Sequence, residues 1–315
     1  MNYGQTTCAD TPVRAVSAPP VRTRGVRTWR FDARGGLPQG CTFSRASTAT
    51  RFDENGDLVD VPTGQVRAGF DPLGTGFKGY ILEPQRTNLI PYSAASTAHW
   101  TLILSPTLTN LSLNALRRFD GLKVASGGAI SSAAKSGTYT ANRGEAYALR
   151  FYYKAGTSGK AYATWGGDMS LSGPVGALAV SFTHTAIGLT VSDLVNTDFG
   201  GGIYAVSCVV RTTGTGTINS YLSFGPSTSV AGEDVILLGA QCEVGDYPTS
   251  YIPTSGAAGT RAAEAFTLTM PFLTNGLFYS SASATDVSLG NFSQNEVMVD
   301  SLATRSATSF YAELG

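Results

Sequence analysis

Apolar and polar residues alternate with a period of two over much of this chain, which is the periodicity of half-buried β-strands. The clearest run, Tyr147-Ala-Leu-Arg-Phe-Tyr-Tyr-Lys154, places Arg150, Tyr152 and Lys154 on one face of a strand. Its other face carries Tyr147, Leu149, Phe151 and Tyr153. The sequence contains no long amphipathic helical pattern, apart from a short turn of helix expected at Asn114–Asp120. We therefore expect an all-β protein.

The middle of the chain carries eight or nine strand patterns at the spacing typical of β-sandwiches, separated by turns rich in Gly, Ser and Thr. This number of strands, without helices to cover them, predicts a two-sheet jelly roll. The expected strands are Leu102–Thr109, Lys123–Ala125, Ala146–Ala155, Ala161–Trp165, Ala177–Thr183, Gly188–Leu194, Ile203–Thr212, Asn219–Phe224 and Val235–Val244.

Shorter β patterns precede this region. The segment Arg51–Val59 predicts a hairpin, because its central Asn55-Gly56 supplies the positive φ angles of a type I′ turn. Asp53, Asn55 and Asp57 also resemble the start of a calcium-binding loop, but the twelfth position of such a loop falls on Gly64 rather than on a glutamate. A hairpin is therefore favoured over a calcium site. The glycine-rich stretch Gly69–Gly79 is expected to be a loop.

The segment Leu238–Thr254 begins as a buried strand and ends in aromatic residues and prolines. Gly239 and Gly245 predict a bulge or a close approach of backbones. Pro248 and Pro253 remove two ladder donors, so the end of the segment is expected to be an edge or an extended cover strand. Tyr247 and Tyr251 are the expected packing anchors.

This segment and two others, Phe43–Val59 and Leu82–Ile90, resemble in this order a family of bacteriophage and gene-transfer-agent virion proteins, found in head spikes and tail fibres. The resemblance implies an N-terminal attachment region at 1–91 and a carbohydrate-binding-module-like jelly roll at 92–256, followed by a short C-terminal β region at 257–315 that is an appendage or an oligomer clasp. It implies a homo-oligomer, by the family's habit a trimer, located in the virion and assembled in the host cytoplasm. The expected partners are other virion proteins (capsid, portal or tail components).

Charge changes this picture at the N-terminus. Charged residues make up 14% of the chain and the formal net charge is zero, but residues 1–51 hold eight arginines against two aspartates, a net +6. With Pro12, Pro19 and Pro20, this arm is expected to order on a partner or to remain a solvated tail. Docking on an acidic protein surface is favoured over nucleic acid, because only Trp29 and Phe31 interleave aromatic rings with the charge. The docking candidates are Arg14, Arg22, Arg24, Arg27 and Arg30.

Cysteines and hydropathy exclude other classes. Cys8, Cys41, Cys208 and Cys242 lack the Cys-x-x-Cys spacing of zinc sites, so buried free thiols are expected ahead of a disulfide between neighbouring strands. Neither a metal nor a cofactor is indicated. No apolar run reaches about 18 residues, and no N-terminal apolar segment is present, so we expect neither a membrane span nor a secretory signal.

Catalytic signals are weak. The chain has two histidines, His99 and His184, and no Gly-x-Ser-x-Gly elbow. The alternative of a capsule-polysaccharide depolymerase needs two neighbouring carboxylates, and the acids of the jelly-roll region fall mostly in predicted turns. We expect no enzyme.

Glycan binding without cleavage needs aromatic faces surrounded by groups that hydrogen-bond to sugars. Alternation places Tyr152, Tyr162, Asn219 and Tyr221 on polar strand faces, with Trp165 and Asp168 at the rim. These residues are the candidate glycan platform. Strand-face tyrosines also pack at subunit interfaces. A purely structural connector, with the tyrosines buried, therefore remains an alternative to a receptor-binding protein.

Overall fold

The computed structural model describes residues 28–32, 37, 41–73, 76–166, 168–183, 188–269, 274–280, 287–292, 296–299, 306–307 and 309–313. Every regular element in these ranges is a β-strand. The described residues accordingly contain no helix that is long and apolar enough to span a membrane. The predicted all-β class is confirmed.

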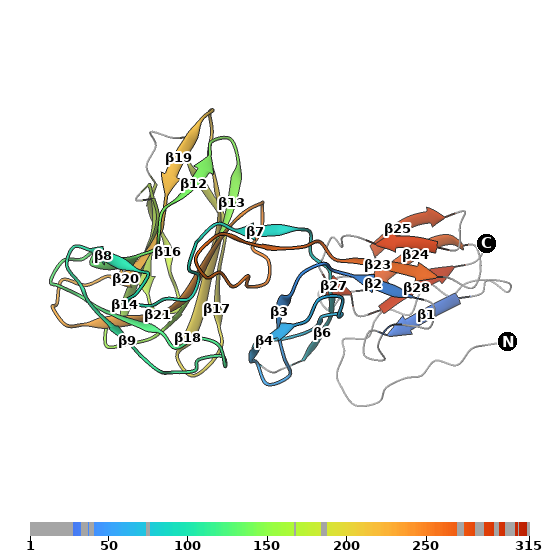
Figure 1. The fold of residues 1–315 in the computed structure, drawn as a ribbon, viewed down its shortest axis with the longest axis horizontal. Coiled ribbons are helices and arrows are strands. Elements are labelled where there is room, and N and C mark those ends of the chain that lie inside the picture. The colour runs from blue at the N-terminus through green and yellow to red at the C-terminus, as the bar shows by residue number, and fades with distance from the viewer. Residues whose placement is uncertain are drawn as a thin grey trace.

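Two antiparallel sheets form a jelly-roll sandwich, which fills the left half of Figure 1. One is an eight-stranded sheet, with six strands in a row; β7 pairs with β21 outside this row, and β22 pairs with β7. In order, the row is β17 (Thr190–Asp198), β18 (Ile203–Arg211), β13 (Ala146–Lys154), β21 (Asp234–Val244), β10 (Leu122–Ala125) and β9 (Thr107–Asn110); the attached strands are β7 (Arg86–Asn88) and β22 (Gly259–Arg261). The six-stranded sheet has the order β16 (Ala179–Thr183), β15 (Met169–Pro174), β14 (Lys160–Trp165), β20 (Leu222–Pro226), β11 (Ala133–Lys135) and β8 (Thr101–Ile103).

The main core lies between these sheets. The Phe151 and Phe224 rings, from opposite sheets, have centroids 5.9 Å apart, and Trp165 is fully buried 5.7 Å from the Tyr147 ring. The face of β13 predicted to be apolar points into this core, so the alternation read from the sequence is confirmed for that strand.

The predicted strand Leu102–Thr109 is two strands, β8 and β9, that belong to different sheets. Leu104 and Ser105 between them both have positive φ angles (55° and 53°), which turn the chain from one sheet to the other. The predicted helical turn at Asn114–Asp120 is also wrong. Asn114, Leu116 and Arg117 have positive φ angles, and Ala115 bridges Phe119 instead.

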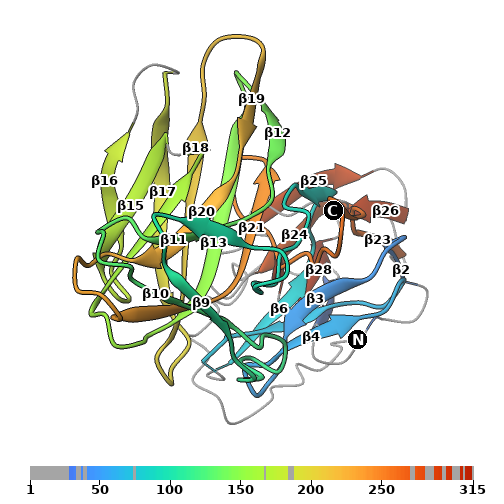
Figure 2. The same ribbon diagram turned by 60° about the vertical axis from the view of Figure 1, so that its left-hand side comes forward.

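The outer face of the eight-stranded sheet is covered by a second cluster of buried residues. Tyr152 projects from β13 on this side, and its ring packs 5.5 Å from Phe119 and 5.7 Å from Tyr251. Leu58 of β4 (Leu58–Val61) belongs to the same cluster. The turn at 115–119, the exit segment at 248–252 and the hairpin of β3 (Ala49–Phe52) with β4 therefore close this face (Figure 2).

The hairpin predicted at 51–59 is confirmed as the β3–β4 pair. Its turn is not the expected type I′ turn, because the loop spans residues 53–57 and Gly56 (φ 79°) has a positive φ angle whereas Asn55 does not. The expected loop Gly69–Gly79 is instead largely a second hairpin, formed by β5 (Ala68–Phe70) and β6 (Phe77–Ile81). A further ribbon, β12 (Tyr139–Asn142) with β19 (Thr217–Ser220), projects from the top of the sandwich in Figure 1.

Glycine 239 lies at an irregularity of the β13–β21 ladder, where the register shifts between Tyr152 and Tyr153. A Cβ on Gly239 would lie 2.9 Å from the Ser93 carbonyl oxygen and 2.7 Å from the Phe119 ring. The predicted bulge and close approach are both present. The fold requires glycine here because the backbone of residues 93–95 crosses directly over this strand.

Strands from the two ends of the chain share sheets at the right of Figure 1. Three pairings join them: β1 (Thr28–Asp32) with β28 (Ser309–Glu313), β2 (Thr42–Ser44) with β23 (Ala265–Thr269), and β6 with β27 (Ser306–Ala307). β24 (Thr274–Ser280), β25 (Val287–Phe292) and β26 (Glu296–Val299) complete these sheets. The described strands before residue 91 and after residue 257 thus share sheets, whereas the boundaries drawn at 91 and 256 stay a prediction.

Candidate functional site

The outer face of the six-stranded sheet carries a row of small polar side chains. The register aligns Lys135 with Ser223, Ser223 with Thr164, and Thr164 with Ser170 across four strands. The hydroxyls of Thr164 and Ser223 are 2.5 Å apart, and those of Ser170 and Ser181 are 2.6 Å apart. These bonded hydroxyls form a polar floor on a face that lies outside the core.

Two tyrosines stand on this floor. Tyr162 comes from β14, and Tyr221 lies at the kink between β19 and β20; both are partly exposed. The Lys135 amino group lies 4.5 Å from the centre of the Tyr221 ring, a cation–π contact. Burial, and secondarily the neighbouring Tyr221, raise the pKa of Tyr162, against the effect of a hydrogen bond with Ser131. The Tyr162 phenol therefore stays a neutral hydrogen-bonding group at physiological pH.

Asp168 lies at one edge of this face, in the turn between β14 and β15, where its backbone N–H donates to the Trp165 carbonyl oxygen. Asn219 is exposed but sits in the β12–β19 ribbon, opposite Thr140 and beyond the sheet itself. The structure thus brings Tyr162 and Tyr221 together, with Asp168 at the rim, and leaves Asn219 on a neighbouring ribbon. Ligand binding by these residues remains a prediction.

Two of the platform residues are placed elsewhere. Tyr152 belongs to the other sheet and is 1% exposed, because Phe119 and Tyr251 cover it. Trp165 points inward and is fully buried in the main core. The prediction of an exposed Tyr152 and a rim Trp165 is therefore corrected: both are packing residues.

The arginines predicted to dock on a particle give no structural test. Arg14, Arg22, Arg24 and Arg27 lie outside the described residues, and only the backbone of Arg30 is described, in β1.

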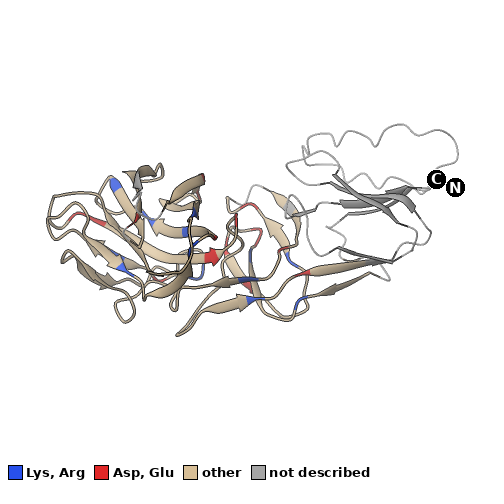
Figure 3. Cartoon of the chain, turned by 90° about the horizontal axis from the view of Figure 1, so that it is seen from above, with Lys and Arg blue, Asp and Glu red and all other residues tan. Residues whose placement is uncertain are grey.

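Each of the three sequence motifs contributes a residue to one largely buried polar network: Arg45, Glu83 and Ser250. The network lies at the junction, the region where the sandwich meets the β3–β4 and β5–β6 hairpins. Arg67, fully buried, donates to both Glu83 (2.8 Å) and Glu264. Arg45 pairs with Glu264 at 2.7 Å, and Arg261 with Glu83 at 2.9 Å. In the middle of the view in Figure 3, positions of Lys or Arg (blue) and of Asp or Glu (red) lie close together. The network therefore ties four distant segments into one body.

The exit segment of β21 depends on side chains for its backbone hydrogen bonds, because its prolines interrupt any ladder. Gln241 accepts from the Ile252 N–H at 2.6 Å, and Asn88 donates to the Ile252 carbonyl at 2.9 Å. Glu243 accepts from both the backbone N–H and the hydroxyl of Thr249. The segment covers the sheet as predicted, but residues 245–254 are irregular and form no strand. Tyr251 is buried as the expected anchor, whereas Tyr247 is only partly buried.

Two glutamates of the junction differ in their proton affinity. Burial raises the pKa of Glu83, but the nearby Arg261 and Arg67 outweigh burial and hold this pKa well below its usual range. Burial raises the pKa of Glu243, and the hydrogen bonds from Thr249 and Gln241 offset this only in part. The two carboxyls therefore give the stability of the chain opposite dependences on pH.

We expect the free energy of unfolding to pass through a maximum at mildly acidic pH. As the pH falls toward about 4.3, the value for an unfolded glutamate, folded Glu243 takes up its proton first, so stability rises. Below about 4.3 the unfolded chain takes up the proton that folded Glu83 resists, so stability falls. Urea denaturation between neutral pH and pH about 3 measures this curve. Glu243→Gln should remove the rise and keep the fall; a wild-type curve that declines steadily from neutral pH would contradict the role of Glu243.

Two of the cysteines lie in the core of the sandwich. Cys208 and Cys242 form no disulfide, and burial raises the pKa of both thiols to about 12. Cys208 and Cys242 behave as small core residues, as predicted. Within the described ranges no group of three or more His, Cys, Asp or Glu side chains could hold a metal ion.

Sequence reasoning missed several of these residues. Lys135 could not be recognised from the sequence, because the three-residue strand β11 is too short to show an alternating pattern. Ser131 lies in the turn before this strand, where no pattern applies. Arg45 and Glu83 lay inside recognised motifs, but charged residues usually indicate solvent-exposed positions. The one available hint was that the chain has few charged residues, so each one placed in a strand-like context was a candidate for burial.

No protein-family model matches this chain, and no curated protein matches it. Among solved structures it is similar to the CBM22-1 xylan-binding domain of Xyn10C from Paenibacillus barcinonensis, with 11% sequence identity and a TM-score of 0.29. The match covers 54% of this chain and 97% of that domain. At this TM-score the similarity is weak, so the candidate site is defined by the geometry of this chain.

Proposed function

We propose that this chain is a non-enzymatic attachment subunit of a bacteriophage-type virion that binds a bacterial surface polysaccharide on the outer face of its six-stranded sheet. The observation that carries the binding role is the pair Tyr162 and Tyr221 with Lys135, standing on a floor of hydrogen-bonded hydroxyls. Tyrosine faces stack on sugar rings, while the phenol and ammonium groups offer hydrogen bonds to sugar hydroxyls. The hydroxyls of Thr164, Ser170 and Ser223 are buried and form the support beneath them.

The virion assignment is supported by the three ordered motifs at 43–59, 82–90 and 238–254, which resemble virion spike and fibre proteins. In this proposal the N-terminal region docks on capsid, portal or tail components, and the chain assembles as a homo-oligomer. Mass spectrometry of purified particles tests this placement: the chain should be present in a fixed ratio to the capsid protein, and its absence from particles would refute it.

A polysaccharide-cleaving role is less well supported. Glycosidases use two carboxyls about 5–9.5 Å apart. Of the described residues that the register places on the tyrosine face and its rim, Asp168 is the only carboxylate. The face is therefore suited to binding.

Replacing both Tyr162 and Tyr221 with alanine is expected to weaken glycan binding by about tenfold or more, because it removes both stacking surfaces. A glycan array identifies the bound polysaccharide, and titration of full-length variants against it measures the loss. Tyr247→Ala is the matched control, since this partly exposed tyrosine follows β21 of the other sheet and also has a cation over its ring, the Arg86 guanidinium. Equal affinity of the double variant and the wild type would exclude this face; a folded wild type that binds no glycan would leave a purely structural connector.

A further inference from the structure

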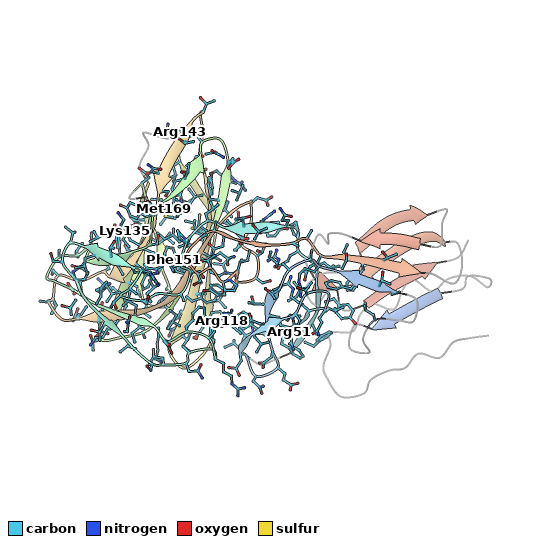
Figure 4. The ribbon with its side chains drawn as sticks, viewed as in Figure 1. Arg51, Arg118, Lys135, Arg143, Phe151 and Met169 are labelled. Atoms are coloured by element: carbon cyan, nitrogen blue, oxygen red, sulfur yellow. The ribbon has the colours of Figure 1, made fainter. Side chains whose placement is uncertain are left out.

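A second concave site lies at the junction, on the opposite sheet from the tyrosine face. The cavity has a volume of about 190 Å³ and opens between the β3–β6 hairpins and β13. Figure 4 labels Arg51 in this region, at the border between the sandwich and the hairpins. The cavity is lined by Arg51, Phe52, Leu58, Phe70, Ile81, Glu83, Arg150, Tyr152, Pro248, Thr249, Ser250 and Tyr251.

Two guanidinium groups face this cavity without a carboxylate of their own. Arg150 is held through Nη1, which donates to the Tyr152 hydroxyl (3.3 Å) and the Thr249 carbonyl (3.1 Å). Arg51 is also held through Nη1, which donates to the Ala68 carbonyl (3.1 Å). Among the described residues no carboxylate lies within ion-pair distance of either guanidinium. Each therefore keeps donors for an external acceptor.

The surroundings carry surplus positive charge. Glu83, the acidic residue in the lining, is already engaged by Arg67, Arg261 and Ser250. Around the junction five arginines (45, 51, 67, 150 and 261) face four carboxylates (Asp53, Glu83, Glu243 and Glu264), a formal excess of +1. Charges in partly buried sites are normally paired, so this excess favours an anion in the cavity.

The rest of the wall is apolar and aromatic. The rings of Phe52 and Phe70 are partly exposed there, whereas Tyr152 and Tyr251 border the cavity as almost fully buried packing residues. The volume of the cavity is below the roughly 300–1,000 Å³ of sites for drug-sized ligands, so it suits one small ring rather than an oligosaccharide. A guanidinium fork binds a carboxylate through two parallel hydrogen bonds, and aromatic rings bind the apolar face of a sugar.

We propose that this cavity is a binding site for a sugar-sized carboxylate, a hexuronic acid residue, whose carboxylate pairs with Arg150 and Arg51. Arg51 belongs to the β3–β4 hairpin and Arg150 to the sandwich, so a ligand held by both links the two parts of the chain. The site is separate from the tyrosine face and does not depend on the function proposed for that face.

Calorimetric titration of the full chain with D-glucuronate tests the proposal, with D-glucose as the neutral sugar of the same shape and acetate as the carboxylate without a ring. Glucuronate should bind at least about tenfold more tightly than either control. Arg150→Gln and Arg51→Gln should each weaken glucuronate binding by about tenfold or more. Arg211→Gln, at an exposed arginine at the end of β18 in the same sheet, should leave it unchanged.

Two further variants keep the test decisive. Arg150→Lys keeps the charge and loses the planar fork, so it should weaken binding even if Arg150→Gln fails to fold. The Tyr162→Ala, Tyr221→Ala double variant should bind glucuronate as the wild type does, which separates this site from the tyrosine face. Absent binding to the wild type, equal affinity for glucose, or unchanged affinity in the folded Arg51→Gln and Arg150→Lys variants would overturn the proposal.

Discussion

Replacement of Arg67 by alanine is expected to lower the free energy of unfolding by about 3–5 kcal/mol, the range measured when one partner of a buried ion pair is removed. Arg67 is fully buried and donates to Glu83, to Glu264, to Ser250 and to the Thr50 carbonyl oxygen. Its loss leaves two buried carboxylates with fewer partners. The expected cost comes mainly from these desolvated charges.

The matched control is Arg117→Ala. Arg117 pairs with Asp57 at 2.8 Å, but its side chain is 66% exposed, so its removal should cost no more than about 1 kcal/mol. Urea denaturation of both variants, followed by tryptophan fluorescence and by far-UV circular dichroism, gives the two costs. The junction is not a stabilising network if Arg67→Ala costs no more than Arg117→Ala.

Replacement of Trp165 by alanine is expected to cost about 3–5 kcal/mol, because a fully buried indole leaves a large cavity in the core. Tyr162, three residues earlier on the same strand, points to the outer face and is partly exposed. Tyr162→Ala should therefore cost much less, about 1 kcal/mol. Denaturation monitored by far-UV circular dichroism compares the two without relying on tryptophan fluorescence. Similar costs for the two variants would place Trp165 at the surface, as the sequence alone indicated.

Tyr162 and Trp165 also show which part of the predicted platform was placed correctly and which part was not. Tyr162 was assigned to an outward face by alternation within β14, and the structure agrees. Trp165 was placed on the rim, although by the same alternation it falls on the opposite face from Tyr162 and therefore points into the core. The error was local, because the period-two pattern applied consistently would have predicted the inward position.

The error over Tyr152 has a different origin. Alternation correctly put Tyr152 on the outer face of β13, but which segments cover that face is not encoded near β13. Phe119 and Tyr251, far away in the sequence, pack on its ring, whereas on the six-stranded sheet Tyr162 and Tyr221 remain partly exposed. Binding experiments that use Tyr152 as a site residue would therefore measure packing.

The sequence by itself determined the β class, the two faces of β13, the presence of the β3–β4 hairpin and the glycine at position 239, because these depend on local periodicity and on the backbone conformations that Gly and Pro permit. Only the tertiary structure decided which strands pair, which sheet face stays uncovered, and that Arg45, Arg67, Glu83, Arg261 and Glu264 form one buried network. Each of those charges alone indicates a solvated position. Burial is favourable only when long-range folding supplies opposite charges and hydrogen bonds at the same point, and no local pattern carries that information.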